Sequence, residues 1–406
     1  MSIARSDIPT VAHTPLSQPS QQHSLTRREW LVASGLGAAA TVALPGFVAA
    51  SPSPIAGATD FTALERAATA ARRAAGPIRL SSNENPFGMS PKAKAAIMDA
   101  WHEHSKYSPP ALPELAAVFA KSVGVPPECV LVTQGSSEVL NITALTFGLH
   151  GGEIVTAWPT FEGLPRYGDT IGATVHRVPL TASLDHDFDM MDRRTTNSVN
   201  LVFVCNPNNP TGVLANSKRV RDFVTSVSRR TNVLVDEAYH DFVDDPSYTS
   251  MVDLVRKGEN VIISRTASKI HGLAGLRVGF AIARPDIIER MRLHVTGNPN
   301  SFGMRAAIAS VNDTEYQAFV RTRTIEERLR LTKTLRDMGK RVIPSHTNFV
   351  FFQTGIPLET VQNSLRDKGF LVGRAFPPYN DWCRVSIGTP EEMASFNAVL
   401  PAALKV

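Results

Sequence analysis

Short apolar runs alternate with longer amphipathic stretches through the middle of the chain. Each run is five or six residues long and is followed by polar or turn-forming residues. The runs cover residues 129–133, 153–157, 174–178, 200–205, 232–236, 260–264 and 278–283. Apolar strands that alternate with amphipathic helices are typical of a mainly parallel sheet with both faces covered. The pattern therefore predicts a large α/β domain built on such a sheet.

The C-terminal part of the chain follows a different pattern, which begins after a break at residues 296–301 that contains Gly297 and Pro299. The elements expected after the break are a long charged helix at residues 313–338, a strand at 348–352, a helix near 358–368 and a strand at 382–387. Two further helices are expected before the sheet, at residues 56–75 and 90–101. The C-terminal elements predict a smaller α+β domain.

The first 50 residues have the order of an export signal. Arg27 and Arg28 precede an apolar run at residues 31–44, and Val48-Ala49-Ala50 follows as a small-residue cleavage site. The run is shorter than the ~20 residues that cross a bilayer, so a retained anchor is the weaker alternative. Because the paired arginines resemble a twin-arginine signal, we expect export by the twin-arginine translocation machinery to the periplasm or beyond, with cleavage after Ala50.

These patterns divide the chain into four predicted parts. They are an export signal at residues 1–50, a linker with an N-terminal segment at 51–104, the large domain at 105–296 and the small C-terminal domain at 297–406.

Composition narrows the class of protein. The chain has 406 residues, of which 43% are hydrophobic and 19% charged, as in soluble globular proteins. The net charge is only +5 and the basic residues form no block, so a nucleic-acid partner is not expected. Cys129, Cys205 and Cys383 lie far apart without ligand spacing, so no metal site is expected.

Polar residues follow several of the apolar runs directly. Ser136 and Ser137 come after the run at 129–133 and open a helix whose N-terminal amides could hold an anion, although an ordinary helix cap is the commoner explanation. Asp236 closes a buried strand, where a carboxylate is costly unless it meets a cation, whereas an ordinary aspartate at a strand end would usually cap the next helix. In open α/β sheets ligands bind beyond the carboxyl ends of the strands, so we expect these side chains to share one site.

Two more strand ends contribute to this candidate site. Residues 206–212, Asn-Pro-Asn-Asn-Pro-Thr-Gly, form a constrained turn that aims a side-chain amide into the cleft. After the run at 260–264 come Thr266, Ser268 and Lys269, with Arg277 eight residues beyond the lysine. Two hydroxyls, an amine and a guanidinium at one strand end predict a phosphate site beside an amine nucleophile, whereas a solvated basic loop is the alternative.

The order of these motifs resembles a known family. Asn-Asn-Pro-Thr-Gly at 208–212, Asp-Glu-Ala-Tyr at 236–239, and Ser268-Lys269 with Gly-Leu-Ala-Gly-Leu-Arg at 272–277 are similar to the fold type I aminotransferases of class I/II, which use pyridoxal 5'-phosphate (PLP). The histidinol-phosphate aminotransferase branch is the most similar, and the resemblance runs from about residue 80 to residue 388. It implies a large PLP-binding domain with a mainly parallel sheet between helices, and a smaller C-terminal α+β domain.

The resemblance also implies a role for each cofactor residue. Lys269 would form the Schiff base with PLP and then move the proton at the substrate α-carbon, and Asp236 would keep the ring nitrogen protonated. Tyr239 and Asn209 would hydrogen-bond the phenolic oxygen, and Phe161 would stack on the ring where the family usually has tyrosine. The residues implied for the phosphate are Ser136, Ser137, Thr266, Ser268 and Arg277, together with Tyr107 reaching across a dimer interface.

For the substrate, the resemblance implies that Arg384 binds a carboxylate or an equivalent anion as a bidentate fork. Arg374 matches a second arginine associated with the substrate tail, with a solvated surface arginine as the alternative. Asn85, in Ser-Asn-Glu-Asn-Pro at 82–86, is expected as a side-chain contact at the substrate entrance, and Asn209 would also face the substrate.

These expectations describe an exported, homodimeric PLP-dependent aminotransferase that moves an amino group between a small amino acid or amine and a 2-oxo acid. A PLP-dependent lyase, decarboxylase or racemase remains an alternative, because these enzymes begin with the same Schiff base. A ligand-binding protein that has lost catalysis is disfavoured because Lys269, Asp236 and Arg277 are present. An export signal also disfavours histidinol phosphate as the donor, because histidine synthesis is expected inside the cell.

Overall fold

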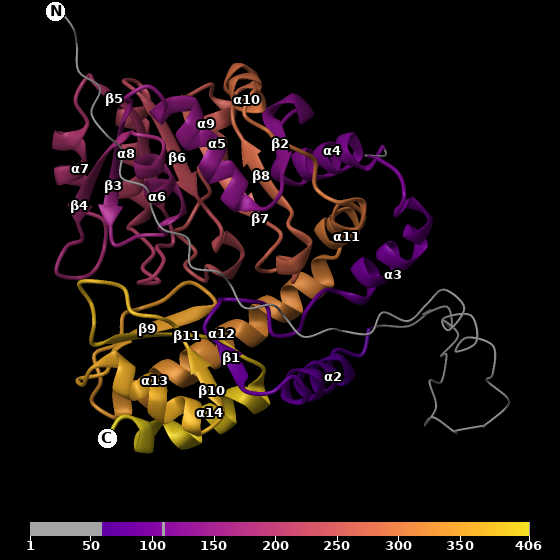
Figure 1. Cartoon of the computed structure of the whole chain (residues 1–406), viewed down its shortest axis with the longest axis vertical. Helices are drawn as coiled ribbons and strands as arrows, with labels where there is room; N and C mark the ends of the chain where they lie inside the picture. The colour runs from indigo at the N-terminus through magenta and orange to yellow at the C-terminus, as the bar shows by residue number, and fades with distance from the viewer. Residues whose placement is uncertain (1–58, 108–109, 406) are drawn as a thin grey trace, which may run out of the picture. The chain divides into compact units, whose positions relative to one another are not determined.

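The apolar runs of the middle of the chain form one seven-stranded sheet in the computed structural model, which describes residues 59–107 and 110–405 (Figure 1). The strands are β2 (Val130–Thr133), β3 (Glu153–Trp158), β4 (Thr174–Pro179), β5 (Val199–Cys205), β6 (Asn232–Asp236), β7 (Val261–Thr266) and β8 (Gly279–Ile282). Their order across the sheet is β2-β8-β7-β6-β5-β3-β4. Only the pairings of β8 with β7 and β2 are antiparallel among the described strands of this sheet. The expected mainly parallel sheet is therefore confirmed.

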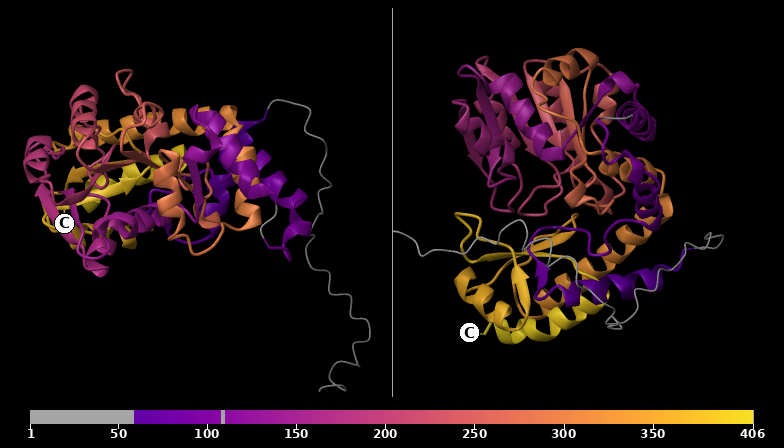
Figure 2. Two further views of the ribbon diagram at one scale, coloured as in Figure 1. Left: turned by 90° about the horizontal axis from the view of Figure 1, so that it is seen from above. Right: turned by 45° about the vertical axis from the view of Figure 1, so that its right-hand side comes forward.

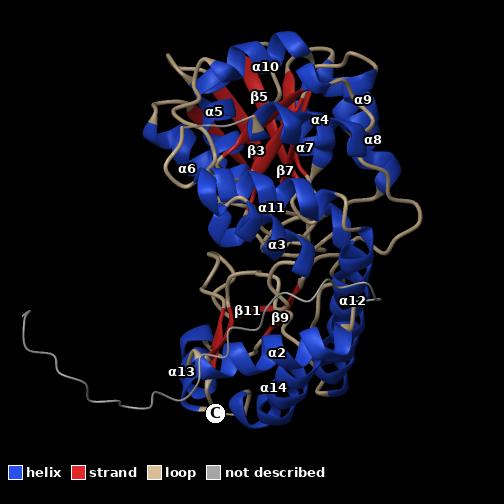
Figure 3. Cartoon of the chain, turned by 90° about the vertical axis from the view of Figure 1, so that its right-hand side faces the viewer, coloured by secondary structure: helices blue, strands red, loops and turns tan. Residues whose placement is uncertain are grey.

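Side chains of the sheet alternate between two hydrophobic cores, one on each face. Along β5, Leu201 and Phe203 join one core, whereas Val202 and Val204 join the other. The first core is covered by α5 (Ser136–Gly148), α6 (Gly163–Thr170) and α10 (Pro285–Arg292). The second is covered by α3 (Pro91–Asp99), α4 (Ala111–Val123), α7 (Phe188–Arg194), α8 (Ser217–Ser228), α9 (Val252–Arg256) and α11 (Ser301–Val311). Because helices cover both faces (Figure 3), a ligand reaches the strands mainly at their ends.

The remaining elements pack around a smaller core. They are β1 (Ile78–Leu80), α12 (Thr314–Asp337), β9 (Phe349–Gln353), α13 (Leu358–Asp367), β10 (Phe370–Val372), β11 (Trp382–Ser386) and α14 (Pro390–Ala403). The helix α2 (Phe61–Ala74) packs Phe61 and Leu64 against a neighbouring cluster that includes Tyr316 and Phe349. β9 and β11 pair in antiparallel fashion, and β1 pairs in parallel with β10. Figure 2 shows the indigo N-terminal helix beside the yellow C-terminal elements, where Arg72 of α2 pairs with Glu392 of α14 at 2.7 Å. The first described residues therefore help to build the C-terminal layer.

Local capping fixes where the N-terminal helices begin. The Asp60 side chain accepts hydrogen bonds from the backbone N–H groups of Thr62 and Ala63, both at 3.0 Å, and α2 starts at the next residue, Phe61. The Ser90 hydroxyl accepts from Ala93 N–H at 3.1 Å, and Pro91 follows as the first residue of α3. Both helices lie within the ranges expected from the sequence and are shorter than those ranges.

The predicted export signal at residues 1–50 lies outside the described residues, as do residues 51–58 of the predicted linker. Within residues 59–107 and 110–405, no helix combines the length and apolar character that a bilayer span requires. The predicted domain borders at residues 104 and 296 stay predictions.

Candidate active site

A cavity of about 270 Å³ opens at the carboxyl ends of β5, β6 and β7. Its lining brings together most of the predicted site residues: Ser136, Ser137, Phe161, Asn209, Asp236, Tyr239, Thr266, Ser268, Lys269, Arg277 and Arg384. Ser82, Asn83, Glu84, Ala238 and Ala274 complete the lining. We call this space the inner cavity.

Lys269 follows β7 and extends its amine into the inner cavity. Nζ donates a hydrogen bond to the backbone carbonyl of Asn83 at 3.0 Å and lies 5.6 Å from the centroid of the Tyr239 ring. Burial lowers the pKa of this amine from 10.5 to about 8, and the positive charge of Arg384 acts in the same direction. The neutral amine that a nucleophile or base requires is therefore far more populated near physiological pH than in an ordinary lysine, although it is still the minor form.

Asp236 is the last residue of β6 and is only 3% exposed. Its Oδ1 has no hydrogen-bond partner among the described residues. Burial raises the pKa of this carboxyl from 3.8 to about 6, although the charge of Lys269 acts against the increase. A buried carboxylate oxygen without a partner is costly, so the site favours a cationic N–H group opposite Asp236.

Tyr239 lies three residues beyond Asp236 in a network of side-chain amides. Its hydroxyl oxygen accepts hydrogen bonds from Nδ2 of Asn83 at 3.1 Å and from Nδ2 of Asn209 at 3.2 Å. Burial raises the pKa of the phenol far above its ordinary value of 10.0, so the group stays protonated and can donate. Its hydrogen atom thus remains available for an acceptor in the inner cavity.

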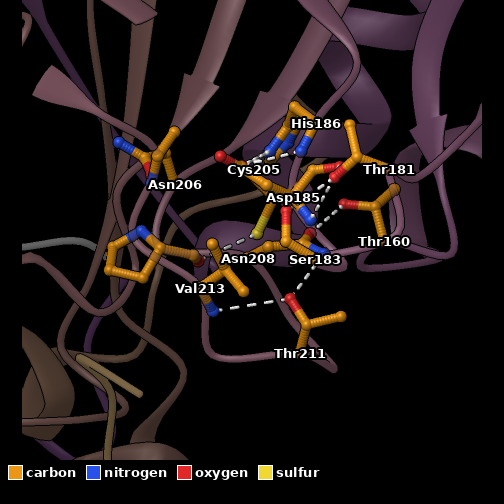
Figure 4. Close-up of polar contacts among 12 residues, drawn as sticks. Thr160, Thr181, Ser183, Asp185, His186, Cys205, Asn206, Asn208, Thr211 and Val213 are labelled. Carbon is orange, nitrogen blue, oxygen red and sulfur yellow. Dashed lines mark hydrogen bonds and ion pairs between the residues drawn. The ribbon is translucent and has the colours of Figure 1, made fainter. Parts of the chain in front are cut away.

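The turn at residues 206–212 is held by the buried side chain of Asn208 (Figure 4). Its Oδ1 accepts from the Thr160 hydroxyl at 2.8 Å, and its Nδ2 donates to the Thr211 hydroxyl at 3.1 Å. The Gly212 N–H donates to the Asn208 carbonyl at 2.7 Å and closes the turn. Because Asn208 is fully used in this way, the neighbouring Asn209 is the amide that faces the cavity.

A helix N-terminus and an arginine meet in another part of the inner cavity, and together they could hold an anion. Gly135 has a φ of +82° and precedes the N-terminus of α5, which places Ser136 and Ser137 at the helix start. A Cβ atom at Gly135 would lie 2.3 Å from Nη2 of Arg277, so only glycine lets this guanidinium approach. Nη1 of Arg277 donates to the carbonyl of Ala274 at 2.8 Å and, more weakly, to the Ser268 hydroxyl at 3.4 Å.

A second, outer cavity of about 500 Å³ shares Phe161, Asn209 and Arg384 with the inner one. Arg384, on β11, donates from Nη1 to Oδ1 of Asn209 at 2.6 Å and from Nη2 to the Ser81 carbonyl at 2.8 Å. Its guanidinium carbon lies 4.9 Å from the centroid of the Phe376 ring. Nε of Arg384 is buried and has no partner in the part of the chain that the structure describes, so the group has capacity for an additional acceptor.

Three predicted site residues do not line the inner cavity. Asn85 is buried, with Nδ2 donating to the Ile270 carbonyl at 2.9 Å and Oδ1 accepting from Phe87 N–H at 3.0 Å, and it is not among the described residues that line either cavity. Arg374 lies on the wall of the outer cavity. Tyr107 is fully exposed in a groove with residues 297–302.

Asn83 and the outer cavity were not predicted from the sequence. Asn83 has a φ of +53°, and its Oδ1 accepts from the Ser386 hydroxyl at 2.8 Å. The sequence predicted a substrate contact in the segment at 82–86 but assigned it to Asn85, whereas the left-handed backbone at Asn83 turns Asn83 towards the inner cavity. Asparagine is one of the few residues that adopt this conformation readily, so a left-handed turn at Asn83 was the signal that could have identified it.

Comparison with known proteins gives a family match over most of the chain. Residues 75–400 match the family model described as aminotransferase class I and II. An aromatic amino acid aminotransferase of Mycobacteroides abscessus is 37% identical over 337 residues, which cover 81% of this chain and 93% of that protein. A histidinol-phosphate aminotransferase of Limosilactobacillus fermentum is 33% identical over 333 residues, covering 80% and 91%.

The fold is also similar to that of a solved aminotransferase structure. The histidinol-phosphate aminotransferase of Sinorhizobium meliloti in complex with pyridoxal 5'-phosphate has a TM-score of 0.76 and 25% identity. That comparison covers 90% of this chain and 98% of the other.

Proposed function

Since the chain belongs to the aminotransferase class I and II family and is a PLP-dependent aminotransferase, we propose that its donor is an amino acid whose carboxylate is bound by Arg384. The donor side chain would enter the outer cavity, where Phe161, Tyr167 and Phe376 supply aromatic surface. The observation that carries this proposal is the buried guanidinium of Arg384, which borders both cavities and has an Nε without a partner among the described residues. A bidentate fork of this kind suits a carboxylate.

The residues of the inner cavity fit PLP. The unpartnered Oδ1 of Asp236 would accept from the protonated ring nitrogen, and the anion site at Gly135 and Arg277 would hold the phosphate. Tyr239 and Asn209 would meet the phenolic oxygen. When bound, PLP supplies an aldehyde that captures amines and a ring that withdraws electrons from the substrate α-carbon.

We assign the remaining roles as follows. The partly neutral Lys269 amine would bind the cofactor covalently and would then hold the proton that leaves the donor α-carbon. Phe161 would lie against the ring face. Ser136, Ser137, Thr266 and Ser268 would add hydrogen bonds to the phosphate.

A matched pair of donors tests the carboxylate assignment. The PLP-loaded protein is assayed with tyrosine and with tyramine, which lacks only the carboxylate, using 2-oxoglutarate as acceptor and measuring glutamate. A charge-assisted hydrogen-bond pair is worth roughly 1.5–3 kcal/mol, so kcat/KM for tyramine should be about 10- to 100-fold lower. Equal turnover of the two donors would remove the carboxylate from the proposal, and repeating the test with phenylalanine and phenethylamine guards against a tail effect.

A homodimer with Tyr107 at the interface is also part of the proposal. Met98, Trp101 and Tyr107 are exposed to 61%, 59% and 104%, and the Trp101 ring stacks on Phe302 at 5.3 Å. Exposed large hydrophobic side chains of this kind suit burial against a second copy. Light scattering should give twice the chain mass, and Tyr107→Ala should weaken PLP retention; a monomer that retains PLP fully would contradict the proposal.

Export to the periplasm completes the proposal and rests on Arg27, Arg28 and the apolar run at residues 31–44. The wild-type chain and a variant with both arginines changed to lysine would be expressed with a functional twin-arginine pathway. We expect the periplasmic wild-type protein to begin at Ser51 and the variant to stay in the cytoplasm. Cytoplasmic retention of the wild type would contradict the proposal.

A further inference from the structure

The outer cavity carries more positive charge than one substrate carboxylate requires. Arg384 provides the fork for that carboxylate, and Arg374 and Arg166 also line this cavity. The guanidinium carbons of Arg374 and Arg384 lie 4.4 Å and 4.9 Å from the centroid of the Phe376 ring, so the two cations are neighbours. Two adjacent cations of this kind could bind the two carboxylates of one dicarboxylate molecule.

Glu162 provides the counter-charge in this cavity. Its Oε2 lies 2.7 Å from Nη2 of Arg374 and 3.8 Å from Nη1 of Arg166. Glu162 directly precedes α6, yet its side chain makes no capping hydrogen bond to that helix among the described residues. The carboxylate is therefore directed to the arginines and contributes little to the start of the helix.

We propose that Glu162 is a specificity-determining residue that competes with anionic substrate tails for Arg374. This inference rests on the proposed function, in which Arg384 binds the donor carboxylate and the outer cavity takes the donor side chain, and it extends both roles to the acceptor. With a neutral donor side chain, the Glu162–Arg374 pair would stay closed. With a dicarboxylate acceptor, the second carboxylate would displace Glu162 from Arg374.

The exposure of this pair makes such an exchange energetically accessible. The side chains of Arg374 and Glu162 are 55% and 23% exposed, so water and salt screen their attraction. Pairs of this kind contribute little to stability, unlike a buried pair whose opening would leave a charge without a partner. A substrate carboxylate can therefore replace Glu162 at little cost, and the strength of the pair sets the preference between neutral and anionic tails.

Two unreactive ligands test the proposal by binding alone. Glutarate has two carboxylates, whereas pentanoate has the same carbon chain and one carboxylate. Titration calorimetry on the PLP-loaded protein measures Kd for both with the wild type and with Glu162→Gln. We expect the variant to bind glutarate about three- to fivefold more tightly and pentanoate within about twofold of wild type. Glu162→Asp, which keeps the charge, should remain closer to wild type.

A double-mutant cycle identifies the partner of Glu162. In an Arg374→Gln background, Glu162→Gln should no longer tighten glutarate binding. Glu289→Gln is the matched control, because Glu289 also pairs with an arginine, Arg292, at 3.3 Å, but on the exposed face of α10. It should change neither Kd.

The outcomes separate this inference from the proposed function. The inference is wrong if Glu162→Gln tightens the binding of glutarate and pentanoate equally, or if it still tightens glutarate binding in the Arg374→Gln background. Either result would mean that the substitution acts through the general charge of the cavity and not through exchange at Arg374. No change in glutarate binding also overturns the inference. Failure of the tyrosine and tyramine test would instead remove the donor assignment, and the calorimetry would still report on the Glu162–Arg374 pair.

Discussion

Replacement of Asp236 by asparagine should stabilise the cofactor-free protein at neutral pH. The carboxyl is buried, and its Oδ1 has no partner within the described part of the chain. Burial raises its pKa from 3.8 to about 6, so the folded state binds this proton more tightly than the unfolded state does. The unfolded chain loses the proton first as the pH rises, and ionisation of Asp236 therefore opposes folding.

The size of this effect follows from the pKa difference. A shift from 3.8 to about 6 corresponds to roughly 3 kcal/mol of lost stability once the pH is well above 6. The penalty is fully absent below pH 3.8, grows between pH 3.8 and 6, and reaches about half its final size near pH 5. Asparagine has nearly the same shape and no charge, so it removes the pH-dependent part of the penalty.

Urea unfolding of cofactor-free wild type and Asp236→Asn at pH 7.5 and pH 5 measures the prediction. The variant should be more stable by about 2–3 kcal/mol at pH 7.5, and its advantage should fall by roughly half at pH 5. Asp222→Asn, at an exposed residue of α8 paired with Lys218, is the matched control and should show no such pH-dependent gain. The reasoning is refuted if Asp236→Asn is destabilised to the same extent at both pH values. With PLP bound the order should reverse, because the introduced amide offers the ring nitrogen no negative charge.

Three further predictions concern the inner cavity. Lys269→Ala should abolish borohydride-stable labelling by PLP, measured by mass spectrometry; labelling equal to wild type would place the covalent bond elsewhere. The rate at which cofactor-free wild type captures PLP, followed by absorbance, should rise with pH and level off above about 8, because the pKa of the Lys269 amine is lowered to about 8. An ordinary lysine would give a rate that keeps rising towards pH 10.5. Gly135→Ala should weaken PLP binding by about tenfold or more in equilibrium dialysis, since a Cβ on a backbone with φ +82° adds strain and displaces Arg277. Gly258→Ala has a similar φ of +79° with no atom near the added Cβ, so unchanged PLP affinity there would separate the two causes.

The sheet was predictable because each strand is a local signal. Runs such as 200–205 and 232–236 are apolar on both faces, and the structure places strands at β5 and β6 with nearly the same ends. β1 and β10 were not predicted, because each has only three residues and gains its partner from the opposite end of the described chain. α14 was also missed, although Thr389 and Glu392 form a capping box at its start.

Within the inner cavity, the positions of some residues were predictable from the sequence and that of Asn83 was not. Asp236, Lys269 and Asn209 follow strands or lie in a constrained turn, so their sequence position fixes where they project, and they meet as expected. The inward position of Asn83 in place of Asn85 depends on a local φ of +53°, which the residue types alone do not reveal.

Glu162 and Arg374 explain why the chemistry of this protein was easier to infer than its substrate. Glu162 precedes α6 on the large sheet, whereas Arg374 follows β10 in the C-terminal layer, and only the packing of these two layers brings them to 2.7 Å. Glu162 was not among the predicted site residues, and Arg374 was predicted with a solvated surface arginine as the alternative. Residues that hold PLP must keep one arrangement for any amino donor, whereas residues around the substrate tail can differ without disturbing the cofactor. Substrate preference should therefore follow contacts such as Glu162–Arg374, and exchanging these two residues between relatives should change the donor or acceptor while PLP binding is retained.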